Sequence, residues 1–126
     1  MLLHLKNSGV KTALVTLSGN DVLEVLKNEN HNIKSAADFN TVFDKIITID
    51  MVEKRKPNPE CYIKAMELLG LRADECLIFE DNLVGAMAAK AAGIDTCIVY
   101  DRHADGEREQ LLKLMPFHIK TFREIL

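Results

Sequence analysis

Short apolar runs alternate with helix-forming segments along the chain, and this alternation limits the fold more than any other feature of the sequence. The runs that are rich in strand-forming residues lie at 10–16, 43–49, 76–79 and 96–100. Segments with apolar residues at helical spacing, or with glycines that end helices, separate these runs. Strands that alternate with helices form a parallel, doubly wound sheet. The sequence therefore predicts an α/β fold with a single domain over residues 1–126.

The segments between the strands are predicted from their end signals, such as proline at a helix start and glycine at a helix end. They comprise the end of a helix at 2–7, a helix that begins after 18–21, an irregular segment at 28–39, a charged loop at 53–58, a helix from Pro59 to Gly70, a small-residue helix at 82–92, an amphipathic helix at 107–115 and a final helical turn at 121–126.

Composition excludes several classes of partner and points to one compartment. The net charge is −3, from 16 basic and 19 acidic residues without a basic block, so we expect no nucleic-acid partner. No apolar run is long enough to span a bilayer, and the sequence shows no secretory signal, so we expect no membrane partner. The three cysteines lack metal-ligand spacing and are expected to be buried free thiols in the reducing cytosol. A cytoplasmic protein is therefore predicted.

Candidate functional residues follow the strands, because ligands of doubly wound sheets bind beyond the carboxyl ends of the strands. The hydroxyl of Thr16 and the backbone amides after it suit a phosphate or another oxyanion. Lys56 brings a positive charge toward the same edge. Glu80 and Asp81 follow the third strand and suit Mg²⁺, which prefers hard oxygen ligands.

Each of these signals also has a simpler interpretation. Residues 16–20 could form an ordinary helix cap through Ser18 or Asn20. Lys56 could be a solvated surface lysine, and the acidic pair could be a helix start stabilised by the helix dipole. Gly85 costs about 1 kcal/mol against alanine inside a helix, and its missing side chain permits close backbone approach. The order of hydroxyl, lysine and acidic pair together favours a binding site.

Three stretches carry a resemblance to a known family: TALVTLSGN at 12–20, KRKPNPECY at 54–62 and IFEDNLVGAMAAKAAGI at 78–94. They resemble the second, third and fourth motifs of the haloacid dehalogenase superfamily, in its β-phosphoglucomutase and phosphoglycolate phosphatase-like branch. The resemblance covers at least residues 10–100. It implies a hydrolase, either a phosphatase or a phosphomutase, that acts on a small phosphorylated metabolite with Mg²⁺.

The resemblance also implies a role for each matching residue. Thr16 would bind the transferring phosphoryl group, with the backbone amide of Leu17 and, more weakly, Asn20 beside it. Lys56 would be the catalytic lysine that neutralises the charge of phosphate and nucleophile. Asp81 would be a direct Mg²⁺ ligand, and Glu80 a ligand directly or through water. Asn82 stands where the branch usually has serine, and both residues can cap the helix.

The first motif of the family, a strand followed by Asp-x-Asp, has no counterpart in the sequence. We therefore expect a partial core that lacks the nucleophile, the acid/base, the cap and one central strand, and that is inactive alone. Neither Asp50 nor Asp101 matches the place of the nucleophile. The open strand edges should be closed by repacking, by self-association or by an N-terminal fragment. The missing residues fit a truncation of the family's core.

Two other functions remain to be weighed. The chain could be a non-catalytic phosphate- or metal-binding pseudoenzyme, and nothing in the sequence separates this from a truncated enzyme. A receiver-like signalling domain is also doubly wound, but there the acidic pair precedes the lysine. In this sequence Lys56 comes before Glu80 and Asp81, which disfavours that alternative.

Overall fold

The computed structural model of the protein describes residues 1–29 and 38–125 and confirms the predicted α/β class. The helices and strands, in chain order, are α1 (Leu2–Asn7), β1 (Ala13–Val15), α2 (Asn20–Glu29), α4 (Phe39–Val42), β2 (Lys45–Ile47), α5 (Glu60–Leu69), β3 (Leu77–Glu80), α6 (Leu83–Ala91), β4 (Asp95–Val99), α7 (Arg108–Leu114) and β5 (Phe117–Ile119). Single 3₁₀ turns follow or precede several of them, at Ile49–Met51, Ala73–Glu75, Arg102–Glu107 and Phe122–Glu124.

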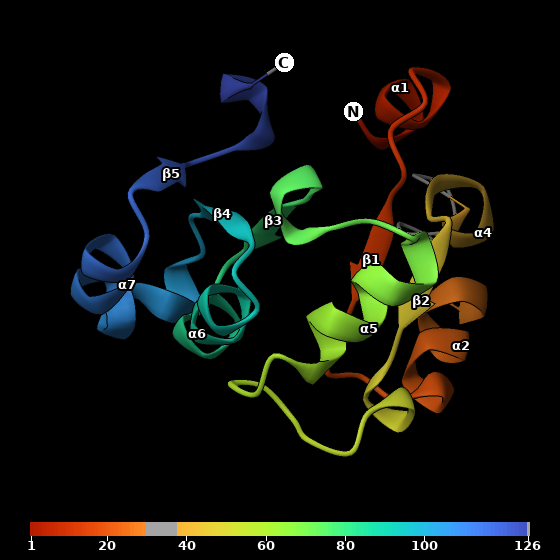
Figure 1. The fold of residues 1–126 in the computed structure, drawn as a ribbon, viewed down its shortest axis with the longest axis horizontal. Coiled ribbons are helices and arrows are strands. Elements are labelled where there is room, and N and C mark those ends of the chain that lie inside the picture. Colours follow the sequence, from red (N-terminus) through yellow and green to blue (C-terminus); the bar gives the residue numbers. More distant parts are fainter. Residues whose placement is uncertain (30–37, 126) are drawn as a thin grey trace.

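The strands form two separate parallel sheets. One has the order β1-β2 and the other the order β3-β4-β5, and every neighbouring pair is parallel. In the view of Figure 1, β1 lies between β2 and β3. The edge strand β1 of one sheet is therefore the neighbour of the edge strand β3 of the other. All four predicted strands are present, and the strand at 96–100 is parallel to its neighbours as expected.

The strand β5 was not predicted, and this part of the sequence analysis was wrong. It has only three residues, directly after Pro116, and pairs with β4 at the edge of its sheet. The alternation of apolar and polar residues at Phe117, His118 and Ile119 is too short to mark a strand in the sequence, because a strand signal needs four to eight residues. The expected irregular segment at 28–39 falls mostly on residues 30–37, which lie outside the described residues.

Two apolar clusters hold the sheets and helices together. The first joins β2, α5 and α6 through Ile47, Tyr62 and Ala88. Val15 of β1 and Ile78 of β3 both pack against it, so one apolar layer connects the two sheets. The second cluster packs α6 and α7 on β4; its members are Ala86, Ile98, Ala104, Leu111 and Met115.

The helix ends follow the predicted signals. Gly70 ends α5 with a positive φ of 66°, and Asn82 caps α6 by accepting a hydrogen bond from the Gly85 amide at 2.8 Å. Within the described residues, none of the helices has the length and apolar character needed to cross a membrane.

Candidate functional site

The loop after β1 is held in place by hydrogen bonds from two elements. The Thr16 amide extends the β1-β2 ladder by donating to the Ile47 carbonyl at 2.9 Å, and the Thr16 hydroxyl accepts from the Ser18 amide at 3.1 Å. Helix α2 begins at Asn20, whose amide donates to Asp50 Oδ2 at 2.8 Å. The cap of α2 therefore comes from the loop after β2, rather than from Ser18 or Asn20.

Asp50 is thus a residue that the sequence analysis undervalued, because it was considered only as a substitute nucleophile. The structure gives Asp50 a supporting role beneath the loop at 16–20. Asp101 has a similar local role, since it accepts a hydrogen bond from the His103 amide at 2.7 Å and caps a 3₁₀ turn. Both carboxylates are engaged by backbone amides. That neither takes the place of the nucleophile stays a prediction.

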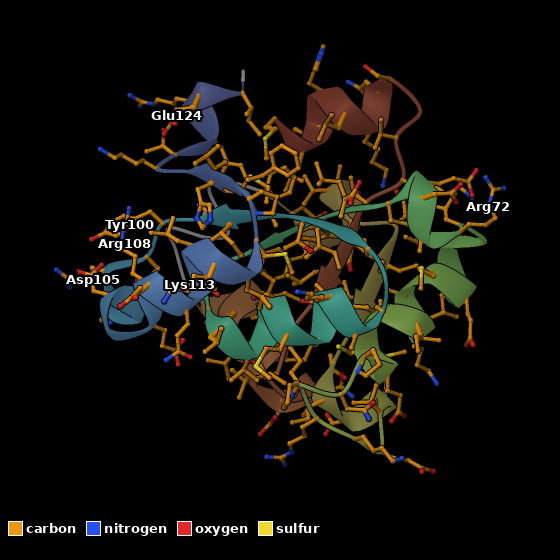
Figure 2. The ribbon with its side chains drawn as sticks, turned by 60° about the vertical axis from the view of Figure 1, so that its left-hand side comes forward. Arg72, Tyr100, Asp105, Arg108, Lys113 and Glu124 are labelled. Carbon is orange, nitrogen blue, oxygen red and sulfur yellow. The ribbon has the colours of Figure 1, made fainter. Side chains whose placement is uncertain are left out.

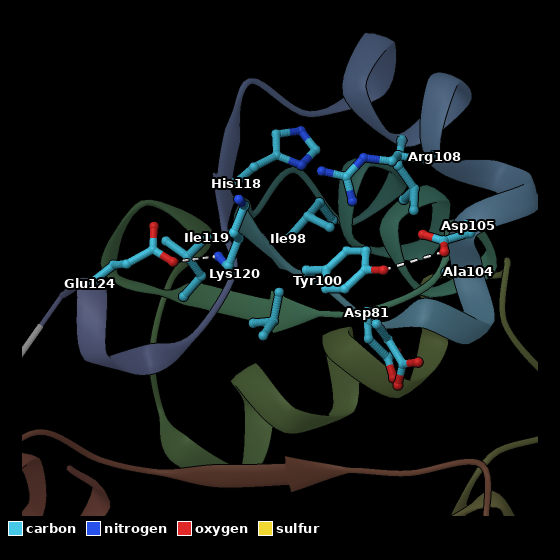
Figure 3. A pocket seen from close by; sticks show the side chains of 13 residues that line it. Asp81, Ile98, Tyr100, Ala104, Asp105, Arg108, His118, Ile119, Lys120 and Glu124 are labelled. Carbon is cyan, nitrogen blue, oxygen red and sulfur yellow. Dashed lines mark hydrogen bonds between the residues drawn. The ribbon is translucent and has the colours of Figure 1, made fainter.

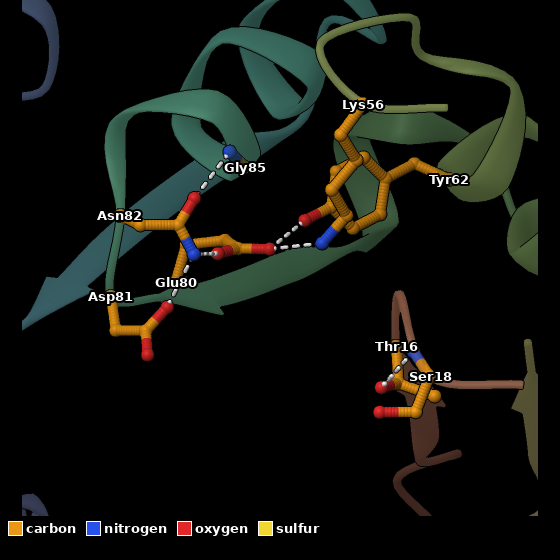
Figure 4. A network of polar contacts seen from close by, with 8 residues as sticks. All are labelled: Thr16, Ser18, Lys56, Tyr62, Glu80, Asp81, Asn82 and Gly85. Carbon is orange, nitrogen blue, oxygen red and sulfur yellow. Dashed lines mark hydrogen bonds and ion pairs between the residues drawn. The ribbon is translucent and has the colours of Figure 1, made fainter. Parts of the chain in front are cut away.

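Lys56 is buried in an ion pair and is therefore not a solvated surface lysine. Its ammonium bonds to Glu80 Oε1, and the two side chains are only 6% and 8% exposed. The Tyr62 hydroxyl donates to the same oxygen, and the Lys56 Nζ lies 4.7 Å from the centre of the Tyr62 ring. Figure 4 shows the three side chains meeting between α5 and the end of β3. A buried charge needs such a partner, because an unpaired one would be strongly disfavoured.

The electrostatics of the cluster follow from its burial. Burial, and then the negative charge of Glu80, raise the pKa of Tyr62, so the hydroxyl keeps its proton and stays a donor. Burial also raises the pKa of the neighbouring Cys61 thiol, against the opposing charge of Lys56. The cluster is therefore a neutral phenol and a neutral thiol around one ion pair.

Gly85 makes room for the Glu80 side chain. A Cβ at position 85 would lie 2.5 Å from Glu80 Oε1 and closer to the rest of the carboxylate. The sequence analysis expected a close backbone approach at this glycine. The structure shows that the approaching group is the carboxylate side chain of Glu80, which lies three residues before the start of α6.

Asp81 is exposed at the end of β3, beside Glu80. Asn82 Nδ2 donates to Asp81 Oδ1 at 2.7 Å and lies 3.5 Å from Glu80 Oε2, so one amide joins the two carboxylates. Asp81 offers a hard oxygen ligand of the kind that Mg²⁺ binds together with waters and substrate phosphate. Glu80 Oε1 is engaged by Lys56 and Tyr62, whereas Oε2 lies 3.5 Å from the Asn82 amide nitrogen. Within the described residues, no group of three or more His, Cys, Asp or Glu side chains converges.

A cavity of about 200 Å³ adjoins Asp81 on the side of β4 and β5. Figure 3 shows its polar lining, which includes Arg108, His118 and Lys120. Arg108 lies 4.8 Å above the ring of Tyr100, and Figure 2 shows the two residues together near α7. The cavity offers open space next to Asp81. Its lining carries both acidic and basic side chains, so its charge does not identify a ligand.

The structure thus brings Lys56, Glu80 and Asp81 together at the end of β3. Of the other predicted residues, Thr16 and Leu17 lie on the loop after β1, a strand of the other sheet, and Asn20 is the first residue of α2. Figure 4 shows Thr16 and Ser18 on a separate segment, bonded to each other and not to the Lys56–Glu80 pair. Their roles in binding phosphate and metal stay predictions.

A family model described as haloacid dehalogenase-like hydrolase matches residues 1–99. The chain belongs to this family. Protein CbbY from Rhodobacter capsulatus is 31% identical over 102 residues, which cover 81% of this chain and 43% of that protein. Pyrophosphatase PpaX from Bacillus cereus (strain AH820) is 34% identical over 96 residues, which cover 76% of this chain and 41% of that protein.

Solved structures confirm the fold. CbbY from Rhodobacter sphaeroides, in a complex with xylulose-1,5-bisphosphate, matches with a TM-score of 0.81 and 24% identity, over 96% of this chain and 51% of that one. The chain therefore spans about half the length of its relatives. The resemblance inferred from the three motifs is confirmed, and the relatives support a phosphohydrolase core.

Proposed function

We propose that this chain supplies the phosphate- and Mg²⁺-binding half of a phosphatase or phosphomutase that acts on a small phosphorylated metabolite. The observation that carries the proposal is the burial of Lys56. The Lys56 side chain is 6% exposed and is held beside Glu80 at a strand end, next to Asp81. This burial supports a role in binding an anion and argues against a solvated surface lysine.

Each residue has a defined task in this proposal. The Thr16 hydroxyl and the Leu17 amide bind phosphoryl oxygens, with Asn20 beside them, and Asp50 fixes their loop. Lys56 neutralises the phosphoryl charge. Asp81 holds Mg²⁺ directly and Glu80 through water, and the ion when bound neutralises charge on the transferring group.

The free thiols at Cys61, Cys76 and Cys97 fit a reducing compartment such as the cytosol.

A carboxylate nucleophile has to come from elsewhere, since no Asp-x-Asp occurs in the sequence. We propose that it enters beside the edge of β1. The Thr16 amide and the Thr12 carbonyl bond to β2. Peptide groups alternate in direction along a strand, so those of Ala13 and Val15 point to the opposite edge, toward β3. Val15 therefore directs its amide and carbonyl away from β2.

The edge of β3 is the counterpart. The Tyr100 amide donates to the Ile119 carbonyl, so the peptide groups of Cys97 point from β4 toward β3. Leu77 and Phe79 then direct theirs away from β4, toward β1. Within residues 1–29 and 38–125, no backbone hydrogen bond reaches either edge from the other side. We propose that an apolar parallel strand from an N-terminal fragment, or less simply a second copy of this chain, pairs with both edges.

The test is hydrolysis of p-nitrophenyl phosphate with Mg²⁺. The chain alone should show no turnover, whereas addition of a polypeptide that supplies a strand ending in Asp-x-Asp should restore it. The same polypeptide with its first aspartate changed to asparagine should not. Lys56→Met and Asp81→Asn should abolish the restored turnover, and Lys54→Met, on the same loop but exposed, should leave it intact.

A non-catalytic phosphate- or metal-binding module is the second candidate, favoured by the lack of an in-line carboxylate. It predicts binding of phosphate and Mg²⁺ without turnover under any complementation. Turnover by the chain alone, abolished by Asp81→Asn, would refute both the requirement for a second segment and the non-catalytic alternative.

A further inference from the structure

The Glu80 carboxylate is confined from several sides. Its Oε1 accepts hydrogen bonds from Lys56 and Tyr62, and its Oε2 lies 3.5 Å from the amide nitrogen of Asn82. The carboxylate also occupies the space that a Cβ on residue 85 would take. Of the groups that bond to this carboxylate, Tyr62 is the one whose side chain is packed in the apolar core. Its ring is 3% exposed and belongs to the apolar cluster that connects the two sheets.

Tyr62 contacts both members of the ion pair. Its hydroxyl donates to the carboxylate, and its ring face lies 4.7 Å below the ammonium. An ammonium has three donors, of which one bonds to Glu80. Because the ring and the carboxylate fix where the ammonium lies, they also fix the direction in which its other donors point.

We propose that Tyr62 is a positioning residue, which holds the Lys56–Glu80 pair so that the lysine presents its remaining donors to phosphate. The inference rests on the proposed function, because it assigns a task to Tyr62 within that site. Tyr62 would act through Lys56 and would not touch the substrate itself. Tyr62 lies in the first turn of α5, three residues after Pro59, and the centre of its ring is 4.7 Å from the Lys56 Nζ.

The experiment follows the Lys56 ammonium directly by ¹H–¹⁵N NMR of lysine side chains at low temperature. A buried, hydrogen-bonded ammonium exchanges its protons slowly and gives a signal, which Lys56→Met assigns by its loss. Tyr62→Phe keeps the ring and removes only the hydroxyl. The matched control is Tyr100→Phe, since the Tyr100 hydroxyl also donates to a carboxylate, that of Asp105, at 3.3 Å but on the surface.

In Tyr62→Phe we expect the Lys56 signal to shift or broaden, and the affinity for inorganic phosphate to fall by about tenfold, as for the loss of one hydrogen bond to a charged group. The backbone amide spectrum should stay that of a folded chain. Tyr100→Phe should change neither quantity. Gly85→Ala disturbs the same carboxylate, so its effect on phosphate affinity should not add to that of Tyr62→Phe.

An unchanged Lys56 signal and an unchanged phosphate affinity in Tyr62→Phe would overturn the inference, as would loss of the fold in that variant. If the wild-type chain bound no phosphate, the proposed function would fail. The Lys56 signal would still decide whether Tyr62 positions the lysine.

Discussion

Alanine at position 85 would force a methyl group into the Glu80 carboxylate. The new Cβ would lie 2.5 Å from Glu80 Oε1 and closer to the other carboxylate atoms, a separation that real Cβ atoms do not show. Either the Glu80 side chain leaves its place or α6 shifts. Both movements separate Glu80 from Lys56 and Tyr62.

Two opposing effects set the magnitude for Gly85→Ala. Alanine in place of glycine favours a helix by about 1 kcal/mol. Disruption of a buried ion pair costs about 3–5 kcal/mol, and the low exposure of both side chains, 6% and 8%, means that solvent screens this pair little. We expect the free energy of unfolding to fall by about 2–4 kcal/mol and Tm by about 10 °C.

Urea denaturation followed by circular dichroism measures the change, with Gly106→Ala as the matched control. Gly106 has open space where a Cβ would lie and no positive φ, so alanine there should alter the free energy of unfolding by less than about 0.5 kcal/mol. If Gly85→Ala proved as stable as the wild type, the packing of Glu80 against Gly85 would not hold the ion pair in place, and the reasoning would be refuted.

Three further predictions concern single side chains. Hydrogen bonds from the Thr12 amide and from Lys6 lower the pKa of Asp44 below its usual 3.8. The stability that Asp44 contributes is therefore present above that pH and is lost as the pH falls through the lowered pKa. Asp44→Asn should make the free energy of unfolding less dependent on pH in the acid range. Asp50→Ala should release the Asn20 amide and weaken phosphate binding about threefold or more, measured by calorimetry, while binding unaffected by the change would contradict the supporting role. Burial raises the pKa of the Cys61 thiol, so its reaction with a thiol reagent at pH 8 should be much slower than that of a free cysteine, and equal rates would show that it is not buried.

The sequence predicted the features that depend on local patterns. Apolar runs marked β1 to β4, and Gly70 and Asn82 marked helix ends, because each signal lies within a few residues of the structure it specifies. The three-residue β5 escaped prediction, since its pairing with β4 decides its conformation and three residues are too few to give a clear strand pattern. Cys97 is buried as expected, whereas Cys76 is only partly so.

The contacts of the candidate site depend on residues that are distant in the sequence. Lys56 and Glu80 are 24 residues apart, and Tyr62 and Glu80 are 18 apart, so their bonds arise from the packing of α5 against the sheets. Motif resemblance located these residues but not their mutual bonds. It also left the purpose of Gly85 open, because only the fold shows which group needs the space.

The most direct test of the site is the coupling between phosphate and Mg²⁺, measured by calorimetric titration of the chain with inorganic phosphate at several Mg²⁺ concentrations. If the strand-end residues share one pocket, Mg²⁺ should raise phosphate affinity, and phosphate should raise Mg²⁺ affinity by the same factor. Asp81→Asn should remove this coupling, whereas Lys56→Met should weaken phosphate binding with or without Mg²⁺. Phosphate binding that is indifferent to both Mg²⁺ and Asp81→Asn would contradict the account.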